Sequence, residues 1–251
     1  MLNLRKPELW FKHICGTPSA DFRLFWFPCA GASFTSYSEW AMDLPPSIEG
    51  FAVRMPGRSD RFHDEPVTDL RQLVEEMAVA VRPLLNRPFI FFGHSFGALS
   101  SFELIRELRY RHTALPVRLF VAGRAAPQVP HKDPPIHHLS DGEFVARLNA
   151  SGGIPREVIE QRELLDVVLP AMRADVQINE SYRYRVEEPL ICPITACGGT
   201  EDEEVTVEDL QAWQGQTSSD FDIQMFGGGH FFVYSQRRAI IRAIVEKLQR
   251  C

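Results

Sequence analysis

The sequence contains no apolar run that approaches the roughly 18 residues a membrane-spanning helix needs. Residues 1–12 lack the hydrophobic core of a secretory signal. Basic residues form no cluster either, because the 27 lysines and arginines are scattered among 33 acidic residues, which leaves a net charge of −6. We therefore expect no membrane partner, no secretory signal and no nucleic-acid binding.

Cysteine is also scarce. The chain holds five cysteines, an odd number, and no pair of them has the C-x-x-C spacing of zinc or redox sites. This usage is typical of a reducing compartment, so we expect a cytoplasmic protein without disulfides or a metal site. The five residues are expected to be small core side chains or, for the last, a free terminal thiol: Cys15, Cys29, Cys192, Cys197 and Cys251.

What the sequence does contain is a regular alternation of apolar strands and amphipathic helices. At 251 residues the chain has the length of one α/β domain. Alternation of this kind predicts a mostly parallel sheet that is covered by helices on both faces. The first 20 residues are expected to be an irregular lead-in. The predicted strands are 24–27, 51–54, 89–92, 119–122, 191–196 and 221–226, and the predicted helices include 36–44, 70–85, 99–108, 205–214 and 235–249.

The pattern changes after Ala126. A proline-rich stretch is followed by two helical segments, 141–150 and 154–184, with no strand between them. We interpret residues 127–189 as a helical insertion, a lid over the edge of the sheet. Ordinary crossover helices are the alternative interpretation.

The most informative stretch lies between the third predicted strand and the helix that follows. Four apolar residues precede a G-x-S-x-G pattern, and an amphipathic run comes after it. This order is typical of a nucleophile elbow, in which a sharp turn exposes a serine hydroxyl. Gly93 and Gly97 omit the Cβ atoms that would collide where strand and helix approach closely. Ser95 is therefore the candidate nucleophile.

A serine hydroxyl needs a nearby base, and His230 is placed to supply one. It follows the last predicted strand through a flexible turn of three glycines. His94 adjoins the serine, but the sharp turn directs its side chain elsewhere, so we interpret it as structural. In α/β-hydrolases the acid lies between serine and histidine in the chain. Asp202 is our candidate, with Glu201 in the same loop as the open alternative.

Two backbone donors are expected to bind the oxyanion that forms during acyl transfer. One is the N–H of Phe96, the residue after the nucleophile. The second belongs to the loop after the first predicted strand, where we assign Ala30. Farther along, we expect Asp209 to lie on an exposed helix face.

With these residues in place, the chain resembles the type II thioesterases that accompany modular polyketide and nonribosomal peptide synthetases. It is also similar to the medium-chain thioesterase of animal fatty acid synthesis. Two departures stand out, because Glu203 occupies a position where the family usually has proline and Cys29 replaces an aromatic residue or histidine. The matching stretches are Phe27–Ala32, Pro56–Arg58, Gly93–Gly97, Arg173–Asp175, Tyr182–Tyr184 and Gly228–Phe232.

The resemblance implies an α/β-hydrolase fold, spanning 1–251 as a single domain with the lid at about 127–189. It implies an editing enzyme that hydrolyses acyl groups from the phosphopantetheine arm of acyl- or peptidyl-carrier proteins, as a monomer and without metal or redox cofactor. Thiols with a pKa near 8.5 leave readily, so a serine, a histidine and an acid suffice. Arg54, Arg58 and Arg61 are candidates for contact with an acidic carrier protein, a solvated turn being the alternative.

Other function classes stay open at this point. The same scaffold supports fatty acyl-carrier-protein thioesterases and small-molecule serine esterases or lipases. A non-catalytic docking protein is the third class, and the presence of both Ser95 and His230 argues against it.

Overall fold

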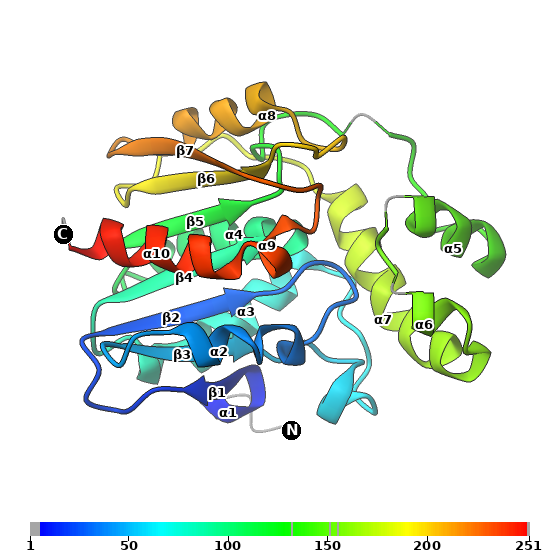
Figure 1. Cartoon of the computed structure of the whole chain (residues 1–251), viewed down its shortest axis with the longest axis horizontal. Coiled ribbons are helices and arrows are strands. Elements are labelled where there is room, and N and C mark those ends of the chain that lie inside the picture. Colours follow the sequence, from blue (N-terminus) through cyan, green and yellow to red (C-terminus); the bar gives the residue numbers. More distant parts are fainter. Residues whose placement is uncertain (1–5, 132, 151, 155, 250–251) are drawn as a thin grey trace.

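The computed structural model describes residues 6–131, 133–150, 152–154 and 156–249 of the chain (Figure 1). A seven-stranded sheet has the strand order β1-β3-β2-β4-β5-β6-β7. Every neighbouring pair is parallel except β1 and β3, which confirms the expected mostly parallel sheet. The strands are β1 (Phe11–Cys15), β2 (Phe22–Phe27), β3 (Ile48–Val53), β4 (Phe89–His94), β5 (Arg118–Ala122), β6 (Ile194–Gly199) and β7 (Phe221–Phe226).

The first 20 residues are not the irregular lead-in that we expected. They include a short helix, α1 (Pro7–Trp10), and the edge strand β1, in which Phe11 pairs with Val53 of β3. Only the first residue of β1 is buried, and the next two, Lys12 and His13, are exposed. Since apolar and polar residues do not alternate along it, β1 gave no strand pattern in the sequence.

Helices cover both faces of the sheet, as the sequence indicated. Figure 1 shows α2, α9 and α10 on the face toward the viewer and α3 and α4 behind it. Several predicted helices are divided into shorter pieces. The helices are α2 (Trp40–Asp43), α3 (Leu70–Val81), α4 (Phe96–Tyr110), α8 (Val207–Gln211), α9 (Phe232–Ser235) and α10 (Arg237–Leu248), with 3-10 turns at Phe34–Tyr37, Ser59–Arg61, Arg82–Leu84 and Ala212–Gln216.

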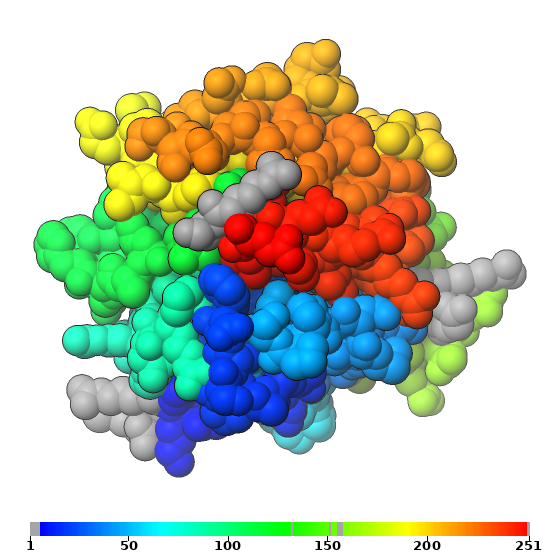
Figure 2. Space-filling model, turned by 60° about the vertical axis from the view of Figure 1, so that its left-hand side comes forward, coloured from blue at the N-terminus to red at the C-terminus, as the bar shows by residue number. Residues whose placement is uncertain are grey.

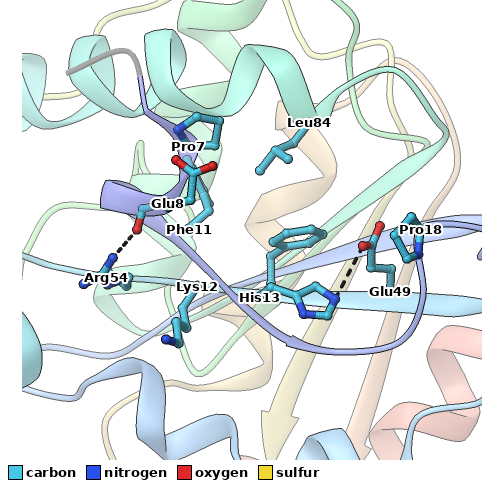
Figure 3. Close-up of a pocket in the computed structure, with 10 residues that line it drawn as sticks. Pro7, Glu8, Phe11, Lys12, His13, Pro18, Glu49, Arg54 and Leu84 are labelled. Carbon is cyan, nitrogen blue, oxygen red and sulfur yellow. Dashed lines mark hydrogen bonds and ion pairs between the residues drawn. The ribbon is translucent and has the colours of Figure 1, made fainter. Parts of the chain in front are cut away.

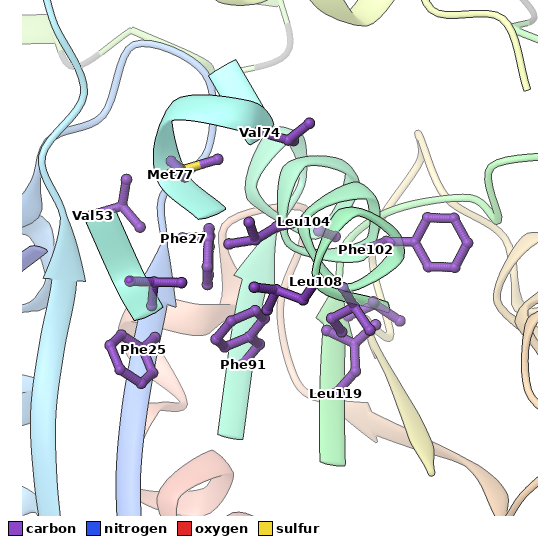
Figure 4. Packing of buried hydrophobic residues seen from close by; sticks show 14 of the residues in the cluster. Phe25, Phe27, Val53, Val74, Met77, Phe91, Phe102, Leu104, Leu108 and Leu119 are labelled. Atoms are coloured by element: carbon purple, nitrogen blue, oxygen red, sulfur yellow. The ribbon is translucent and has the colours of Figure 1, made fainter. Parts of the chain in front are cut away.

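Alternate residues of the central strands point to opposite faces and build two apolar layers. In β2, Leu24 and Trp26 belong to the layer under α10, whereas Phe25 and Phe27 belong to the layer under α3 and α4. Figure 4 shows part of this second layer, in which Phe91 lies close to Leu108 of α4. Burial on both sides explains why these strands read as continuous apolar runs.

The helix α10 covers the face of the sheet opposite α3 and α4, and ion pairs join it to the helix α2. Arg237 forms ion pairs with Glu39 (2.8 Å) and Asp43 (2.9 Å), and Arg238 adds a bond to Asp43 (3.0 Å). In Figure 2 the red surface of α10 lies directly against the light blue segment that contains α2. None of the helices in the described part of the chain is long and apolar enough to cross a membrane.

Residues 127–189 lie within the connection from β5 to β6, which contributes the helices α5 (Asp141–Ala150), α6 (Arg156–Ile159) and α7 (Arg162–Ser181). Figure 1 shows these helices beyond the ends toward which the arrows of the central strands point. They bury an apolar cluster of their own, which contains Phe144, Ile154, Leu169, Met172 and Val176. Ala30, on the loop after β2, packs against both this cluster and the main core.

Candidate active site

Ser95 occupies the sharp turn between β4 and α4. Its backbone has φ 52° and ψ −111°, a left-handed conformation that is uncommon for a residue with a side chain. The turn is held by two bonds, since the Ser95 N–H donates to the Ala122 carbonyl at 2.8 Å and the Ala98 N–H donates to the Ser95 carbonyl at 3.0 Å. This is the geometry expected of a nucleophile elbow.

The two glycines of the elbow are sterically required. A Cβ atom on Gly97 would lie 1.9 Å from the carbonyl oxygen of Phe27, and one on Gly93 would lie 2.3 Å from the carbonyl oxygen of Gly97. Both contacts are with backbone atoms, which cannot move aside as a flexible side chain can. The G-x-S-x-G pattern therefore reflects the close packing of β4, α4 and the end of β2.

Asp202 and His230 meet at the same edge of the sheet. Nδ1 of His230 lies 3.1 Å from Oδ2 of Asp202, whose side chain is completely buried. The other carboxylate oxygen, Oδ1, accepts hydrogen bonds from the N–H groups of Glu204 (2.9 Å) and Val205 (3.2 Å). Of the two acids left open by the sequence, Asp202 is the one that contacts His230, whereas Glu201 is exposed.

The surroundings of His230 keep its imidazole basic. Burial by itself lowers the pKa of His230, but the hydrogen bond to Asp202 and the charges of Glu204 and Asp202 outweigh burial, so the pKa is raised above its ordinary value. Glu204 stands farther off, with Oε2 3.8 Å from Nδ1, and its side chain is 45% exposed. Burial raises the pKa of Asp202, but the hydrogen bond to His230 and the charge of His230 lower it by more. The pKa of Asp202 is therefore below its ordinary value, and the carboxylate stays ionised.

His94 is buried and contacts the backbone of His230. Its Nε2 lies 2.9 Å from the His230 carbonyl oxygen, and the two rings are 5.3 Å apart. Burial, followed by the charge of His230, lowers the pKa of His94 to about 3, so His94 is neutral and donates through Nε2. The residue before Ser95 is thereby tied to the turn that carries His230. The ends of β4, β6 and β7 bring Ser95, Asp202 and His230 to one edge of the sheet.

The two expected oxyanion donors flank the elbow. Phe27 pairs with Gly93, so the loop that follows β2 begins beside Ser95, and Ala30 lies on that loop. Phe96 is the first residue of α4, where backbone N–H groups have no partner within the helix.

The loop also contains Cys29, which is buried, and whose Sγ lies 3.6 Å from the hydroxyl oxygen of Tyr234. Burial is the largest influence on this thiol and raises the pKa of Cys29 to about 11. All four cysteines in the described part of the chain are free thiols, and Cys251 lies outside the described residues.

The expectation that Arg58 and Arg61 are available to contact an acidic carrier protein is wrong. Arg58 and Arg61 are 7% and 8% exposed, so neither is a surface contact for a partner. Arg61 is held by Asp64 at 2.7 Å, while Arg54 forms an ion pair with Asp60 at 2.8 Å.

Asp209 is not an exposed helix residue either. Its carboxylate accepts the Thr206 N–H, and its own N–H donates to the Thr206 hydroxyl, which forms a capping box at the start of α8. Thr206 three residues before an acid matches the capping-box pattern at the start of a helix.

Sequence reasoning assigned no role to Asp175, which pairs with Arg58 next to the loop that contains Ala30. Both residues fall in stretches that resemble the family, Pro56–Arg58 and Arg173–Asp175, and this resemblance was the only signal available.

A cavity of about 450 Å³ lies elsewhere, at the outer edge of the sheet beside α1, β1 and β3 (Figure 3). Its buried carboxylate, Glu49, is already paired with Arg23 (2.7 Å) and with His13 (3.4 Å). None of the candidate catalytic residues lines it. Among the described residues, no group of three histidine, cysteine or acidic side chains is arranged to hold a metal ion.

The strand order, the elbow and the meeting of Asp202 with His230 define a protein of the α/β-hydrolase fold. Within that class, the chain belongs to the thioesterase domain family, whose model matches residues 22–248. It is therefore an enzyme that hydrolyses thioester bonds.

Two similar proteins have names that refer to gramicidin. The chain is 40% identical over 240 residues to the gramicidin S biosynthesis protein GrsT of Aneurinibacillus migulanus, covering 96% of this chain and 94% of the relative. It is 43% identical over 246 residues to the protein named linear gramicidin dehydrogenase LgrE of Brevibacillus parabrevis, covering 97% and 94%.

Among solved structures, the type II thioesterase BorB from the borrelidin biosynthetic cluster superposes with a TM-score of 0.87. The identity is 36%, and the match covers 95% of this chain and 97% of that one. These findings confirm the resemblance to type II thioesterases that was seen in the sequence.

Proposed function

We propose that the protein is an editing thioesterase that removes acyl groups from the phosphopantetheine arm of acyl- or peptidyl-carrier proteins in polyketide or nonribosomal peptide biosynthesis. The observation that carries the proposal is the contact between His230 Nδ1 and the buried carboxylate of Asp202 at the edge where the elbow presents Ser95. The family, together with GrsT and BorB, supports the pathway class. We expect the enzyme to act as a monomer without a metal or redox cofactor.

In the proposed reaction, Ser95 Oγ attacks the thioester carbonyl carbon while Nε2 of His230 takes the hydroxyl proton. Asp202 holds Nδ1 and stabilises the imidazolium that forms. The negative oxygen of the tetrahedral intermediate accepts bonds from the N–H groups of Ala30 and Phe96.

When the intermediate collapses, the carbon–sulfur bond breaks and His230 returns its proton to the leaving thiolate. The acyl group is now an ester of Ser95. A water molecule gives a proton to His230 and attacks the same carbonyl, and a second collapse releases the acid and restores the serine hydroxyl.

The segment 127–189 acts in this proposal as a lid. Its helix α7 packs on the loop that carries Ala30. A Cβ atom added to Gly31 of that loop would lie only 2.5 Å from Cε of Met172 in α7. In this proposal the acyl chain binds against partly buried apolar side chains that border the cluster of α5 to α7, such as Leu148 and Leu165. Because one methylene changes binding in an apolar pocket by roughly 1–3 kcal/mol, such a surface discriminates weakly by chain length, as an editing enzyme requires.

Two other substrate classes are weighed against this one. A fatty acyl-carrier-protein thioesterase shares the chemistry and differs only in its partner, and a small-molecule esterase shares the triad. The word dehydrogenase in the name of LgrE does not extend to this chain, since the sequence has no G-x-G-x-x-G dinucleotide fingerprint.

The test compares three substrates with one acyl group: an acyl-carrier protein, the acyl thioester of free pantetheine and an oxygen ester. We expect the highest kcat/KM on the carrier protein and loss of all hydrolysis in Ser95→Ala. A fluorophosphonate should label the wild-type protein at Ser95 and leave Ser95→Ala unlabelled. A preference for the oxygen ester would favour the esterase, and an unlabelled wild type would contradict the serine mechanism.

A further inference from the structure

The peptide groups beyond Ala30 are held by a buried ion pair. The N–H of Gly31, which belongs to the Ala30–Gly31 peptide, donates to Oδ2 of Asp175 at 2.8 Å. One residue later, the carbonyl oxygen of Ala32 accepts a bond from Arg58 Nη1 at 3.0 Å. The loop that follows β2 is therefore fixed on both sides of Gly31 by groups that come from other elements.

The two charged groups are joined by a fork of two hydrogen bonds. Arg58 Nη1 lies 2.7 Å from Oδ2 of Asp175, and Nη2 lies 2.9 Å from Oδ1. Nη2 also donates to the carbonyl oxygen of Ala171 at 3.4 Å. Asp175 is 1% exposed and Arg58 is 7% exposed. Since Asp175 and Ala171 belong to α7, the ion pair links this helix to the loops after β2 and β3.

Two glycines allow these three segments to approach. Gly31 has φ 75°, and a Cβ atom there would lie 2.5 Å from Met172 Cε. Gly57 has φ 79°, and a Cβ atom there would lie 2.6 Å from Pro66 Cγ and 3.2 Å from Ala171 Cβ. The positive φ values disfavour side chains at both positions, so the contact between α7 and the loops depends on glycine.

Stability alone does not account for this arrangement. A buried ion pair is costly to desolvate, and replacing it with apolar residues often leaves a protein as stable. What a bidentate arginine–carboxylate pair provides is a defined geometry. Here the ion pair fixes the position of the peptide group next to the proposed oxyanion donor.

We propose that Asp175 and Arg58 are positioning residues that set the Ala30 loop for oxyanion binding, and that they do so only while α7 is seated. The inference rests on the proposed function, in which Ala30 is an oxyanion donor. It adds that the oxyanion site forms only when α7 of the lid packs on the Ala30 loop. An enzyme whose lid has moved away then lacks the assembled oxyanion site and does not hydrolyse the thioester.

The test uses Asp175→Asn, in which one oxygen that accepts a hydrogen bond is replaced by an amide nitrogen that donates. We expect kcat to fall about tenfold to a hundredfold with little change in KM, because the affected donor acts in the transition state. Arg58→Lys keeps the charge but loses the fork, and it should give a smaller loss in the same sense. If Asp175→Asn fails to fold, Arg58→Lys still tests the proposal.

A second measurement separates positioning from general damage. A trifluoromethyl ketone analogue of the acyl thioester adds to the Ser95 hydroxyl, its carbonyl oxygen becoming the oxyanion while the proton passes to His230. The same ligand with a methylene in place of the carbonyl forms no adduct. We expect the affinity of Asp175→Asn for the ketone to fall in parallel with kcat, and its affinity for the methylene ligand to stay unchanged.

The matched control is Glu49→Gln, which breaks a second buried ion pair, that with Arg23, at the far edge of the sheet. It should lower the unfolding temperature without changing kcat or ketone affinity. Equal losses for both ligands in Asp175→Asn, or an unchanged kcat, would overturn the positioning role. Failure of the wild type to form the ketone adduct would instead overturn the serine mechanism itself.

Discussion

Nε2 of His94 donates a hydrogen bond to the backbone carbonyl oxygen of His230, across 2.9 Å. The residue before the candidate nucleophile thus holds the backbone of the candidate base. Because burial lowers the pKa of His94 to about 3, the ring stays neutral over the working pH range, and the bond persists. This contact between side chain and main chain, together with the ring contacts of His94 with His230 and Phe231, joins strand β4 to the turn after β7.

Replacing His94 with phenylalanine removes the donor and leaves the His230 carbonyl without its partner. We expect kcat to fall about tenfold with KM nearly unchanged, because small displacements of a catalytic group cost large factors in rate. An orphaned buried carbonyl also costs about 1–3 kcal/mol of stability. Steady-state kinetics and urea unfolding measure the two effects. His94→Gln, which keeps a donor, is the control, and a kcat equal to wild type in His94→Phe would show that the contact serves packing alone.

Asp202→Asn should reduce kcat far more than Glu201→Gln. The carboxylate of Asp202 holds Nδ1 of His230 at 3.1 Å, and an amide there can select the wrong tautomer. We expect a loss of about a thousandfold or more, as for triad acids in general. Glu201 is exposed, so its neutralisation should change kcat less than about twofold. Hydrolysis of an acyl-carrier protein measures both, and the reverse ranking would move the acid to Glu201.

Glu204→Gln should move the acid limb of the pH–rate profile to lower pH. The charge of Glu204 is one of the influences that raise the pKa of His230. His230 must be neutral to accept the serine proton, so a lower pKa extends activity toward acid. The plateau rate should change little, since Asp202 makes the direct contact. The measurement is kcat/KM against pH, with the exposed Glu208 of α8 changed to glutamine as the control. A limb that stays in place, or moves to higher pH, would contradict this electrostatic role.

Gly97→Ala should destabilise the fold by about 3 kcal/mol or more, because the new methyl group would overlap the Phe27 carbonyl oxygen at 1.9 Å. Gly142→Ala is the matched control. Gly142 lies near the start of α5, and no atom stands within 4 Å of a Cβ placed there. Alanine favours helix at that site and should stabilise it by up to about 1 kcal/mol. Urea unfolding followed by circular dichroism compares the two, and similar stabilities would show that the elbow relaxes.

The central strands and the turns that carry Ser95 and His230 could be predicted because each rests on local pattern. Apolar runs marked the central strands, and glycines marked both turns. The choice between Asp202 and Glu201 could not be made locally, since neighbours in one loop differ only in which way they turn. The structure distinguishes them because the N–H groups of Glu204 and Val205 draw Asp202 inward.

The ion pair of Arg58 with Asp175 joins residues 117 positions apart in the chain, so no local pattern could reveal it. An arginine in a polar stretch reads as exposed until its distant partner is known. The edge strand β1 was missed for a related reason, because its pairing with β3 rather than its own sequence pattern makes it a strand. Asp209 differs from both, since its capping partner Thr206 lies only three residues away.

The burial of Cys29 has a consequence for what becomes of the acyl group. A thiolate beside the reacting carbonyl would itself attack a thioester and carry the acyl chain as a dead-end adduct. With its pKa raised to about 11, Cys29 stays protonated at neutral pH and offers no competing acceptor. A thioester hydrolase with this buried, protonated thiol near its candidate active site is thus protected from acylation of its own cysteine.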